Sequence, residues 1–313
     1  MPHSPWARVL QFLLAPLTLF LPGWAHAFEV RFEPVAEGVY AYIGESGPRT
    51  FQNYGLNANY GLVVTPAGAL LIDSGASRQG AELLAKAAQR VTAQPIRWVI
   101  NSGSQDQRWL GNSYFRSQGA EIMAHAGAEA DMRNRGQAHL NQLRPVLKQR
   151  LQGTELVLPQ RWLQGTDETL SLGGVAVEVK YRGGGHSPGD VIVWLPQQRV
   201  AFAGDVVYVQ RMLGMNPASR TKPWLASFAA LESLQPTVVV PGHGPLTTLE
   251  QAQRDTRDLL VALRQHMRAA VSQMTDMDSA VKSFDGSAFM RLEHAETWLP
   301  QLANRTYLDV ERE

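Results

Sequence analysis

Residues 183–190 read Gly-Gly-Gly-His-Ser-Pro-Gly-Asp and stand directly before an apolar run that predicts a β-strand. Two further glycine-flanked segments, Ala-Gly-Asp at 203–205 and Pro-Gly-His-Gly-Pro at 241–245, are each predicted to end a strand. Each segment carries one residue of a metal-binding type, namely His186, Asp205 and His243. Glycine lets the backbone approach closely, and side chains at strand ends can converge at one edge of a sheet. Imidazole and carboxylate together suit zinc or iron.

Taken singly, each residue has a simpler interpretation. A lone histidine in a loop is usually only solvated, and an aspartate after glycine often caps a helix or a turn. The order and spacing of the three segments favour a shared site.

The rest of the chain predicts two strand-rich halves that each carry helices, which is typical of a four-layer αββα sandwich. Strands are expected at 39–43, 60–65, 69–73, 96–100, 122–124, 168–172, 175–181, 190–195, 199–203 and 237–240. Helices are expected at 78–92, 126–152 with a bend or break at Pro145, 223–234 and 248–274, and residues 275–313 predict a final helix and a surface segment. Residues 28–313 are expected to form one domain.

With Asp73 in Leu-Ile-Asp-Ser-Gly at 71–75, the ordered set of segments resembles the metallo-β-lactamase superfamily. It is most similar to the exported SoxH-like, quinoprotein-associated branch and more distantly resembles glyoxalase II, over about residues 30–265. The resemblance implies an αββα metallo-β-lactamase-type sandwich with a dinuclear metal cleft between the sheet edges. It also implies that His186 binds the first metal, Asp205 bridges the two metals and His243 binds the second.

The sequence departs from this family at its best-known motif, Thr-His-x-His-x-Asp-His. Residues 101–112 read Asn-Ser-Gly-Ser-Gln-Asp-Gln-Arg-Trp-Leu-Gly-Asn. A gap-free register places Gly103 and Gln105 at the first two histidines, Gln107 at the aspartate and Arg108 at the last histidine. A shift by one residue recovers only Asp106, and no histidine occurs between residues 27 and 124.

Two interpretations of the remaining trio stay open. His186, Asp205 and His243 could hold one zinc or iron ion in a rearranged site, because catalytic zinc usually keeps three protein ligands. Alternatively the cleft holds no metal cofactor, and the positive charge of Arg108 favours this second interpretation. We then expect an Arg108 nitrogen within about 4 Å of an Asp205 oxygen, and no metal-sized space between His186 and His243.

The predicted cleft also includes Asp73, Gly103, Gln105, Gln107, Arg108 and Asp190. Aromatic and methionine residues in the predicted loops could line an apolar ligand pocket or fill the core; they are Phe51, Tyr54, Tyr60, Trp109, Met212 and Met215. Ser102 and Ser104 have no histidine nearby in sequence, so a serine hydrolase is not favoured. The sequence therefore predicts a hydrolase fold impaired in metal-dependent hydrolysis and retained for binding a small ligand or partner. The alternative is an active hydrolase of an ester, thioester or lactam.

Residues 1–27 have the pattern of a signal peptide: Arg8, then an apolar run, then Ala-His-Ala at 25–27. This predicts a periplasmic or secreted protein with no membrane span after cleavage. The chain has no cysteine, which excludes disulfides and thiolate nucleophiles. Its net charge of +1, from 29 basic and 28 acidic residues, gives no nucleic-acid footprint. The oligomeric state is left open.

Overall fold

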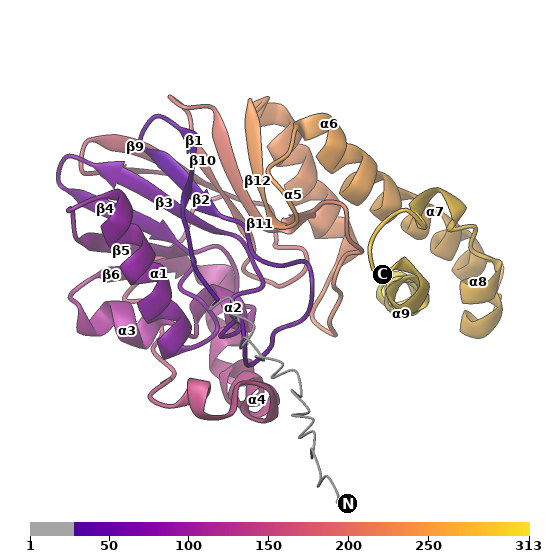
Figure 1. The fold of residues 1–313 in the computed structure, drawn as a ribbon. Helices are drawn as coiled ribbons and strands as arrows, with labels where there is room; N and C mark the ends of the chain where they lie inside the picture. Colours follow the sequence, from indigo (N-terminus) through magenta and orange to yellow (C-terminus); the bar gives the residue numbers. More distant parts are fainter. Residues whose placement is uncertain (1–27) are drawn as a thin grey trace, which may run out of the picture.

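The structure is a computed structural model that describes residues 28–313, and the predicted signal peptide lies outside these residues. Two β-sheets face one another (Figure 1), and the first has seven strands in sequence order. These strands are β1 (Glu33–Ala36), β2 (Val39–Tyr42), β3 (Tyr60–Thr65), β4 (Gly68–Ile72), β5 (Ile96–Asn101), β6 (Glu121–His125) and β7 (Arg161–Leu163). β1 to β4 pair antiparallel, and β4 to β7 pair parallel through helical crossovers.

The second sheet has five strands in the order β12-β11-β10-β9-β8. They are β8 (Asp167–Leu172), β9 (Val175–Tyr181), β10 (Val191–Leu195), β11 (Val200–Tyr208) and β12 (Val238–His243). Only β11 and β12 pair parallel. Every residue of β10 and β11 is buried, as expected for strands that are covered on both faces.

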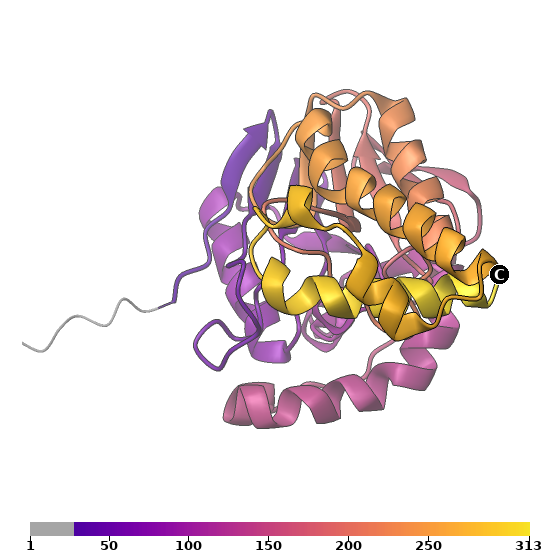
Figure 2. The ribbon, with the colours of Figure 1, turned by 90° about the vertical axis from the view of Figure 1, so that its right-hand side faces the viewer.

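Helices cover the outer face of each sheet, which gives the four layers seen in Figures 1 and 2. α1 (Arg78–Val91) and α3 (Asn112–Ser117) lie on the first sheet, and the single turn α2 (Asp106–Trp109) precedes α3 in the chain. α4 (Glu129–Leu147) lies at the bottom of the molecule in the view of Figure 1. On the second sheet lie α5 (Thr221–Leu234), α6 (Leu249–Ala252) and α7 (Asp258–Ser272), while α8 (Met277–Ser283) and α9 (Ala295–Glu311) pack against α7 and each other. The predicted αββα metallo-β-lactamase-type sandwich is therefore confirmed.

Apolar side chains from both sheets share one central core. Leu70 and Ile100 of the first sheet belong to the same buried cluster as Val193 and Phe202 of the second. Separate clusters lie under the outer helices: Leu84 of α1 packs with the first sheet, and Leu263 of α7 with the second. Burial between the sheets is what fixes their strand ends at a common edge.

Several predicted boundaries were wrong. Residues 126–152 do not form one helix broken at Pro145: α4 includes Pro145 in its last turn, ends at Leu147 and is followed by a 3-10 turn at Lys148–Leu151. Residues 248–274 form α6 and α7, separated by a π-helical turn at Gln253–Arg257. The short strands β1 and β7 and the short helices α2 and α3 were not predicted, because elements of three to six residues carry little periodicity.

The prediction that Asp205 ends a strand is also wrong, since β11 continues to Tyr208. The pairing of β11 with β12 shifts register on both sides of Gly204, whose φ is +50°. This irregularity turns the strand and lets it continue beyond the aspartate. No helix within residues 28–313 is long and apolar enough to cross a membrane.

Candidate functional site

The three predicted ligand residues meet at one edge of the sandwich. His186 comes from the glycine-rich loop before β10, Asp205 from β11 and His243 from the last residue of β12. The Nδ1 atom of His186 lies 3.7 Å from Asp205 Oδ2, and the Nε2 atom of His243 lies 3.3 Å from Asp205 Oδ1. The predicted convergence of these residues is confirmed.

Arg108 reaches this point from α2, on the side of the first sheet. Its Nη2 lies 2.6 Å from Asp205 Oδ1 and its Nε lies 3.1 Å from Asp205 Oδ2, which makes the pair bidentate. Its Nη1 donates to Asp73 Oδ2 at 2.8 Å. The remaining donors reach the backbone carbonyls of Asn59 at 3.2 Å and Gly242 at 3.3 Å. All five N–H groups of this buried guanidinium therefore have acceptors.

Asp205 has no acceptor capacity left over. Oδ1 also accepts the hydroxyl of Tyr208 at 3.2 Å, and Oδ2 accepts Nε2 of Gln107 at 3.2 Å. Together with Arg108 and His243, these donors occupy both carboxylate oxygens, which offer about four lone-pair positions. The predicted contact between Arg108 and Asp205 is confirmed, with the shortest distance at 2.6 Å.

Asp73 supports Arg108 from the first sheet. It follows β4 with a φ of +68°, a conformation that aspartate tolerates better than most residues. Its Oδ1 accepts the backbone N–H of Ser102 at 2.6 Å, and its Oδ2 accepts the Ser102 hydroxyl at 2.7 Å. Burial raises the pKa of Asp73 to about 6, against the lowering effect of the Arg108 charge. Arg108 thus joins a carboxylate of each sheet.

The electrostatics of the site keep Asp205 ionised and the histidines neutral. Burial alone would raise the pKa of Asp205, but the Arg108 charge and the hydrogen bond from His243 hold it well below its usual range. Burial lowers the pKa of His243 to about 4, although Asp205 opposes this shift, and burial also lowers the pKa of His186. The ion pair of Asp205 and Arg108 is therefore the charged centre of the site.

Gly103 and Asp190 lie beneath this centre and contact one another. A Cβ atom built on Gly103 would lie within 2.4 Å of Asp190 Oδ1. Asp190 accepts the backbone N–H of Ser187 at 2.6 Å and also accepts the Ser187 hydroxyl. Burial, followed by the charge of Asp205, raises the pKa of Asp190 to about 8. A larger residue in place of Gly103 cannot enter unless Asp190 moves.

A pocket of about 260 Å³ opens above the ion pair. Of the residues predicted for the cleft and its rim, Gln105, Gln107, His186, His243 and Met215 line it. Both histidines line this pocket, but the absence of a metal-sized space between His186 and His243 stays a prediction. Buried core positions hold Tyr60, Trp109 and Met212 instead.

The serine residues are held by carboxylates and not by histidines. Ser102 donates to Asp73, and Ser104 donates to Asp131 at 2.6 Å. Both are buried below the pocket. This arrangement supplies no imidazole base to either hydroxyl.

Sequence reasoning missed the other residues that line this pocket, among them Arg49, Arg211 and Tyr208. Tyr208 stacks on His243 with ring centroids 5.0 Å apart. Arg211 packs against the same tyrosine, with its guanidinium carbon 5.8 Å from the ring centroid. None of them belongs to a recognisable motif, although Arg211 follows Asp205 by six positions on the same strand-and-loop segment.

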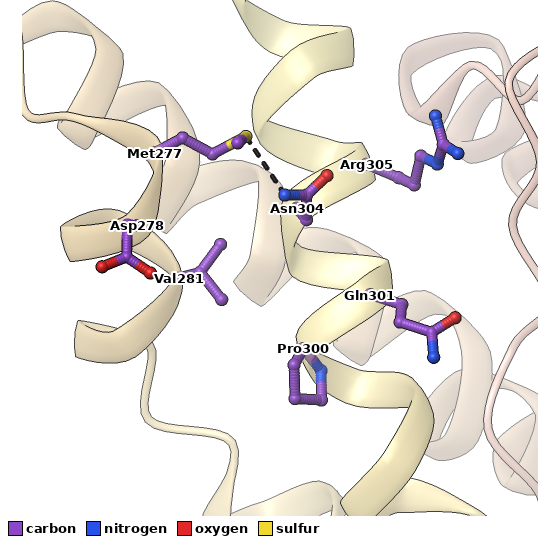
Figure 3. Close-up of a pocket in the computed structure, with 7 residues that line it drawn as sticks. All are labelled: Met277, Asp278, Val281, Pro300, Gln301, Asn304 and Arg305. Carbon is purple, nitrogen blue, oxygen red and sulfur yellow. Dashed lines mark hydrogen bonds between the residues drawn. The ribbon is translucent and has the colours of Figure 1, made fainter.

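A larger pocket, of about 410 Å³, lies between α8 and α9 and contains none of the predicted site residues (Figure 3). Met277, Val281 and Pro300 form its apolar surface. Asn304 donates to the sulfur of Met277 at 3.2 Å across it. Nothing in this pocket resembles the chemistry of the strand edge.

The residues present do not fit a metal ion as arranged. Within residues 28–313, no group of three or more His, Cys, Asp and Glu side chains is placed to hold one. The physical obstacle is the guanidinium of Arg108, a permanent cation that occupies the oxygens of Asp205. A metal at Asp205 would face this cation at close range, in a buried setting where charge repulsion is strong.

The αββα layers, with two histidines and an aspartate gathered at one edge of the sandwich, define a class of two-sheet hydrolase folds. The profile of the Metallo-beta-lactamase superfamily matches residues 53–243, which is more than half of the chain. The chain belongs to the metallo-beta-lactamase superfamily.

Individual relatives are distant. A metallo-beta-lactamase type 2 from Elizabethkingia meningoseptica is 24% identical over 274 residues, which cover 86% of this chain and 99% of the relative. A hydroxyacylglutathione hydrolase, GloC, from Haemophilus influenzae is 29% identical over 140 residues, which cover 43% of this chain and 65% of the relative.

A solved metallo-beta-lactamase from Pontibacter korlensis is 23% identical and has a TM-score of 0.58, with 72% of this chain and 96% of that chain covered. The solved DIM-1 metallo-beta-lactamase is 22% identical and has a TM-score of 0.59, with coverages of 74% and 97%. At these identities the structural likeness shows the fold alone.

Proposed function

We propose that this protein is a SoxH-like member of the superfamily whose metal site has been replaced by an internal cation, and that it binds a small molecule without metal-dependent hydrolysis. The bidentate pair between Arg108 and Asp205 carries this proposal. In the gap-free register, Arg108 stands where the family motif has its last histidine. At this position the family motif has a metal-binding histidine, whereas Arg108 supplies a positive charge in place of the metal.

The energetics favour retention of the pair over exchange for a metal. Withdrawing Arg108 from Asp205 would also remove its contacts with Asp73, Asn59 and Gly242. A guanidinium displaced within the protein would be buried without partners, which costs several kcal/mol. An incoming ion would gain only His186, Asp205 and His243, since Gly103 and Gln105 replace the first two motif histidines.

The alternative function is an active hydrolase with one metal bound by His186, Asp205 and His243. One observation favours it: the Nδ1 atom of His186 is buried and has no hydrogen-bond partner among residues 28–313. Candidate substrates for this alternative are esters, thioesters and lactams, by analogy with the fold only.

Metal analysis tests the proposal directly. Protein purified without chelators is expected to contain no stoichiometric zinc or iron, and chelator treatment should leave its melting temperature unchanged. The Arg108→His variant is the matched control, because a histidine at this single position still leaves Gly103, Gln105 and Gln107 in place. It should not gain stoichiometric metal. Tightly held metal in the wild-type protein, at one ion per chain, would overturn the proposal and favour the hydrolase alternative.

We also propose export to the periplasm or the exterior, from the signal-peptide pattern of residues 1–27. Expression of the full chain followed by mass spectrometry of the exported protein should show a mature N-terminus at Phe28. Retention of residues 1–27 on protein in the cytoplasm would contradict it.

A further inference from the structure

We propose that the pocket lined by His186 and His243 binds the anionic group of a small organic molecule through Arg211, with α9 forming the wall for the rest of that molecule. The ligand class is a carboxylate or phosphate joined to an apolar body. This inference rests on the proposed function and specifies the ligand that the pocket takes.

Arg211 is a buried cation without a counterion. It is only 4% exposed, and within residues 28–313 it forms no salt bridge with a carboxylate. Among the described residues, its buried Nε has no partner, and the side-chain hydrogen bond that it forms there joins Nη1 to His243 Nδ1 at 3.1 Å. Because an arginine stays charged in proteins, burial without an anion is unfavourable.

Arg108 provides an internal comparison for this argument. It lies at the same strand edge and is similarly buried, but all of its donors are satisfied by two carboxylates and two carbonyls. The same fold therefore pairs one arginine fully and leaves the other directed at a pocket. A ligand anion is the partner that Arg211 lacks.

The pocket surface selects for negative charge. Its lining includes Arg49 and Arg211 but no aspartate or glutamate. Arg49, at the mouth, is paired with Asp106, but its Nε is buried and has no partner among the described residues. Amide groups of Asn216 and Gln105 add neutral donors to the same wall.

The apolar wall comes from the C-terminal helix, beyond the residues that match the superfamily. Trp298 of α9 lines the pocket, and the guanidinium carbon of Arg211 lies 5.0 Å from its ring centroid. Trp298, Met215 and Gly214 also line an adjoining pocket of about 200 Å³, which extends along α9 to Arg305. The two adjoining spaces fit an anion bound at Arg211 with an apolar group against Trp298.

The test uses metal-free wild-type protein, with sodium phosphate and sodium benzoate as probes at matched ionic strength against sodium chloride. Benzyl alcohol is the uncharged counterpart of benzoate. We expect saturable binding and a raised melting temperature with both anions, and at least about tenfold weaker binding of benzyl alcohol. Stronger binding of benzoate than phosphate would identify the carboxylate with an apolar body, and the reverse order would identify the phosphate.

Variants assign the site. Arg211→Gln should weaken anion binding by about tenfold or more, since a charge-assisted hydrogen bond is lost, and should not lower the melting temperature of the ligand-free protein. Arg211→Lys, which keeps the charge, is the second variant if the glutamine protein fails to fold, and it should bind more weakly than wild type.

Trp298→Ala should weaken benzoate binding more than phosphate binding. Arg116→Gln, on the exposed surface of α3, is the matched control and should bind as wild type does.

No saturable binding of either anion, or equal binding by wild type and Arg211→Gln, would overturn the inference. Metal content is measured on the same preparation, so the two proposals fail separately. If metal-free protein binds neither anion, the inference of an anion site is refuted, but the proposed function is not. If the protein contains stoichiometric metal and loses anion binding on chelation, the proposed function is refuted as well.

Discussion

Arg108 is the residue on which the site depends. Its buried guanidinium satisfies Asp73 and Asp205, two carboxylates that would otherwise stand close together without a cation. Lysine in its place would keep the charge but not the planar, bidentate geometry. The same side chain therefore neutralises the buried carboxylates and, under the proposed function, takes the place of the metal.

Replacing Arg108 with methionine should lower the free energy of unfolding by roughly 3–5 kcal/mol, because both carboxylates lose their partner. Arg108→Lys should have a smaller effect. Denaturant titrations followed by circular dichroism measure the difference, with Arg116→Met on the surface as the control. A loss below about 1 kcal/mol for Arg108→Met, within the range typical of exposed pairs, would contradict the assigned role.

Asp190 should make stability depend on pH. Its pKa in the folded protein is raised to about 8, so folding retains a proton that the unfolded chain releases above its ordinary pKa of 3.8. This contribution is fully present below the unfolded pKa, and it is lost as the pH rises towards about 8.

Asp190→Asn removes this proton linkage and should gain stability relative to wild type, by up to about 1.4 kcal/mol per pH unit between pH 5 and 8. The variant can start less stable at pH 5, because it alters the acceptor of the Ser187 hydrogen bonds. The measured quantity is the difference between the two unfolding free energies at each pH. A difference that stays constant over this range would show that Asp190 is ionised in the folded protein.

At the scale of elements, the single turn α2 is fixed in place by the loop after β4. Backbone N–H groups of Ser74 and Gly75 donate to the carbonyls of Arg108 and Gln107, each at 3.1 Å. In return, the N–H of Gly111 donates to Gly75 at 2.8 Å. A helix of four residues has little stability of its own, so these bonds decide where Arg108 points.

Gly111→Ala should disrupt this contact, because a Cβ atom there would lie 1.9 Å from the carbonyl oxygen of Ser74. We expect a loss of roughly 1–3 kcal/mol or more, as found when close packing is overfilled. Gly47→Ala is the control, since nothing lies within 4 Å of its Cβ position. Thermal unfolding of both variants measures the effect, and equal melting temperatures would show that the loop after β4 can yield.

At the scale of the whole molecule, the two sheets are held together by a shared core and by Arg108. The central cluster contains Leu70 and Phe202 from opposite sheets, and Arg108 binds a carboxylate from each. Removal of either sheet would expose the apolar inner face of the other.

Residues 28–313 should therefore unfold in one cooperative transition. Tryptophans report on both halves, with Trp98 in β5 and Trp194 in β10. Fluorescence, near-ultraviolet and far-ultraviolet circular dichroism should give coincident denaturant curves. Two separated transitions would mean that the sheets form independently folding domains.

The sequence by itself determined the fold class, the absence of histidine between residues 27 and 124, and the convergence of His186, Asp205 and His243. Each of these follows from local pattern: His and Asp flanked by glycine close to predicted strands, helical or alternating periodicity, and residue types at 101–112. The short elements and the continuation of β11 past Asp205 were not predictable, because they depend on pairing with distant strands.

Only the tertiary structure decided how the two arginines are used. The acceptors of Arg108 lie 35, 49, 97 and 134 positions away in the sequence, at Asp73, Asn59, Asp205 and Gly242. Arg211 meets Trp298 across a similar separation and meets no carboxylate among the described residues. The packed sheets and helices decide which chain segments meet at one edge, and therefore whether a buried charge is paired or faces a pocket. A local sequence pattern does not contain this information.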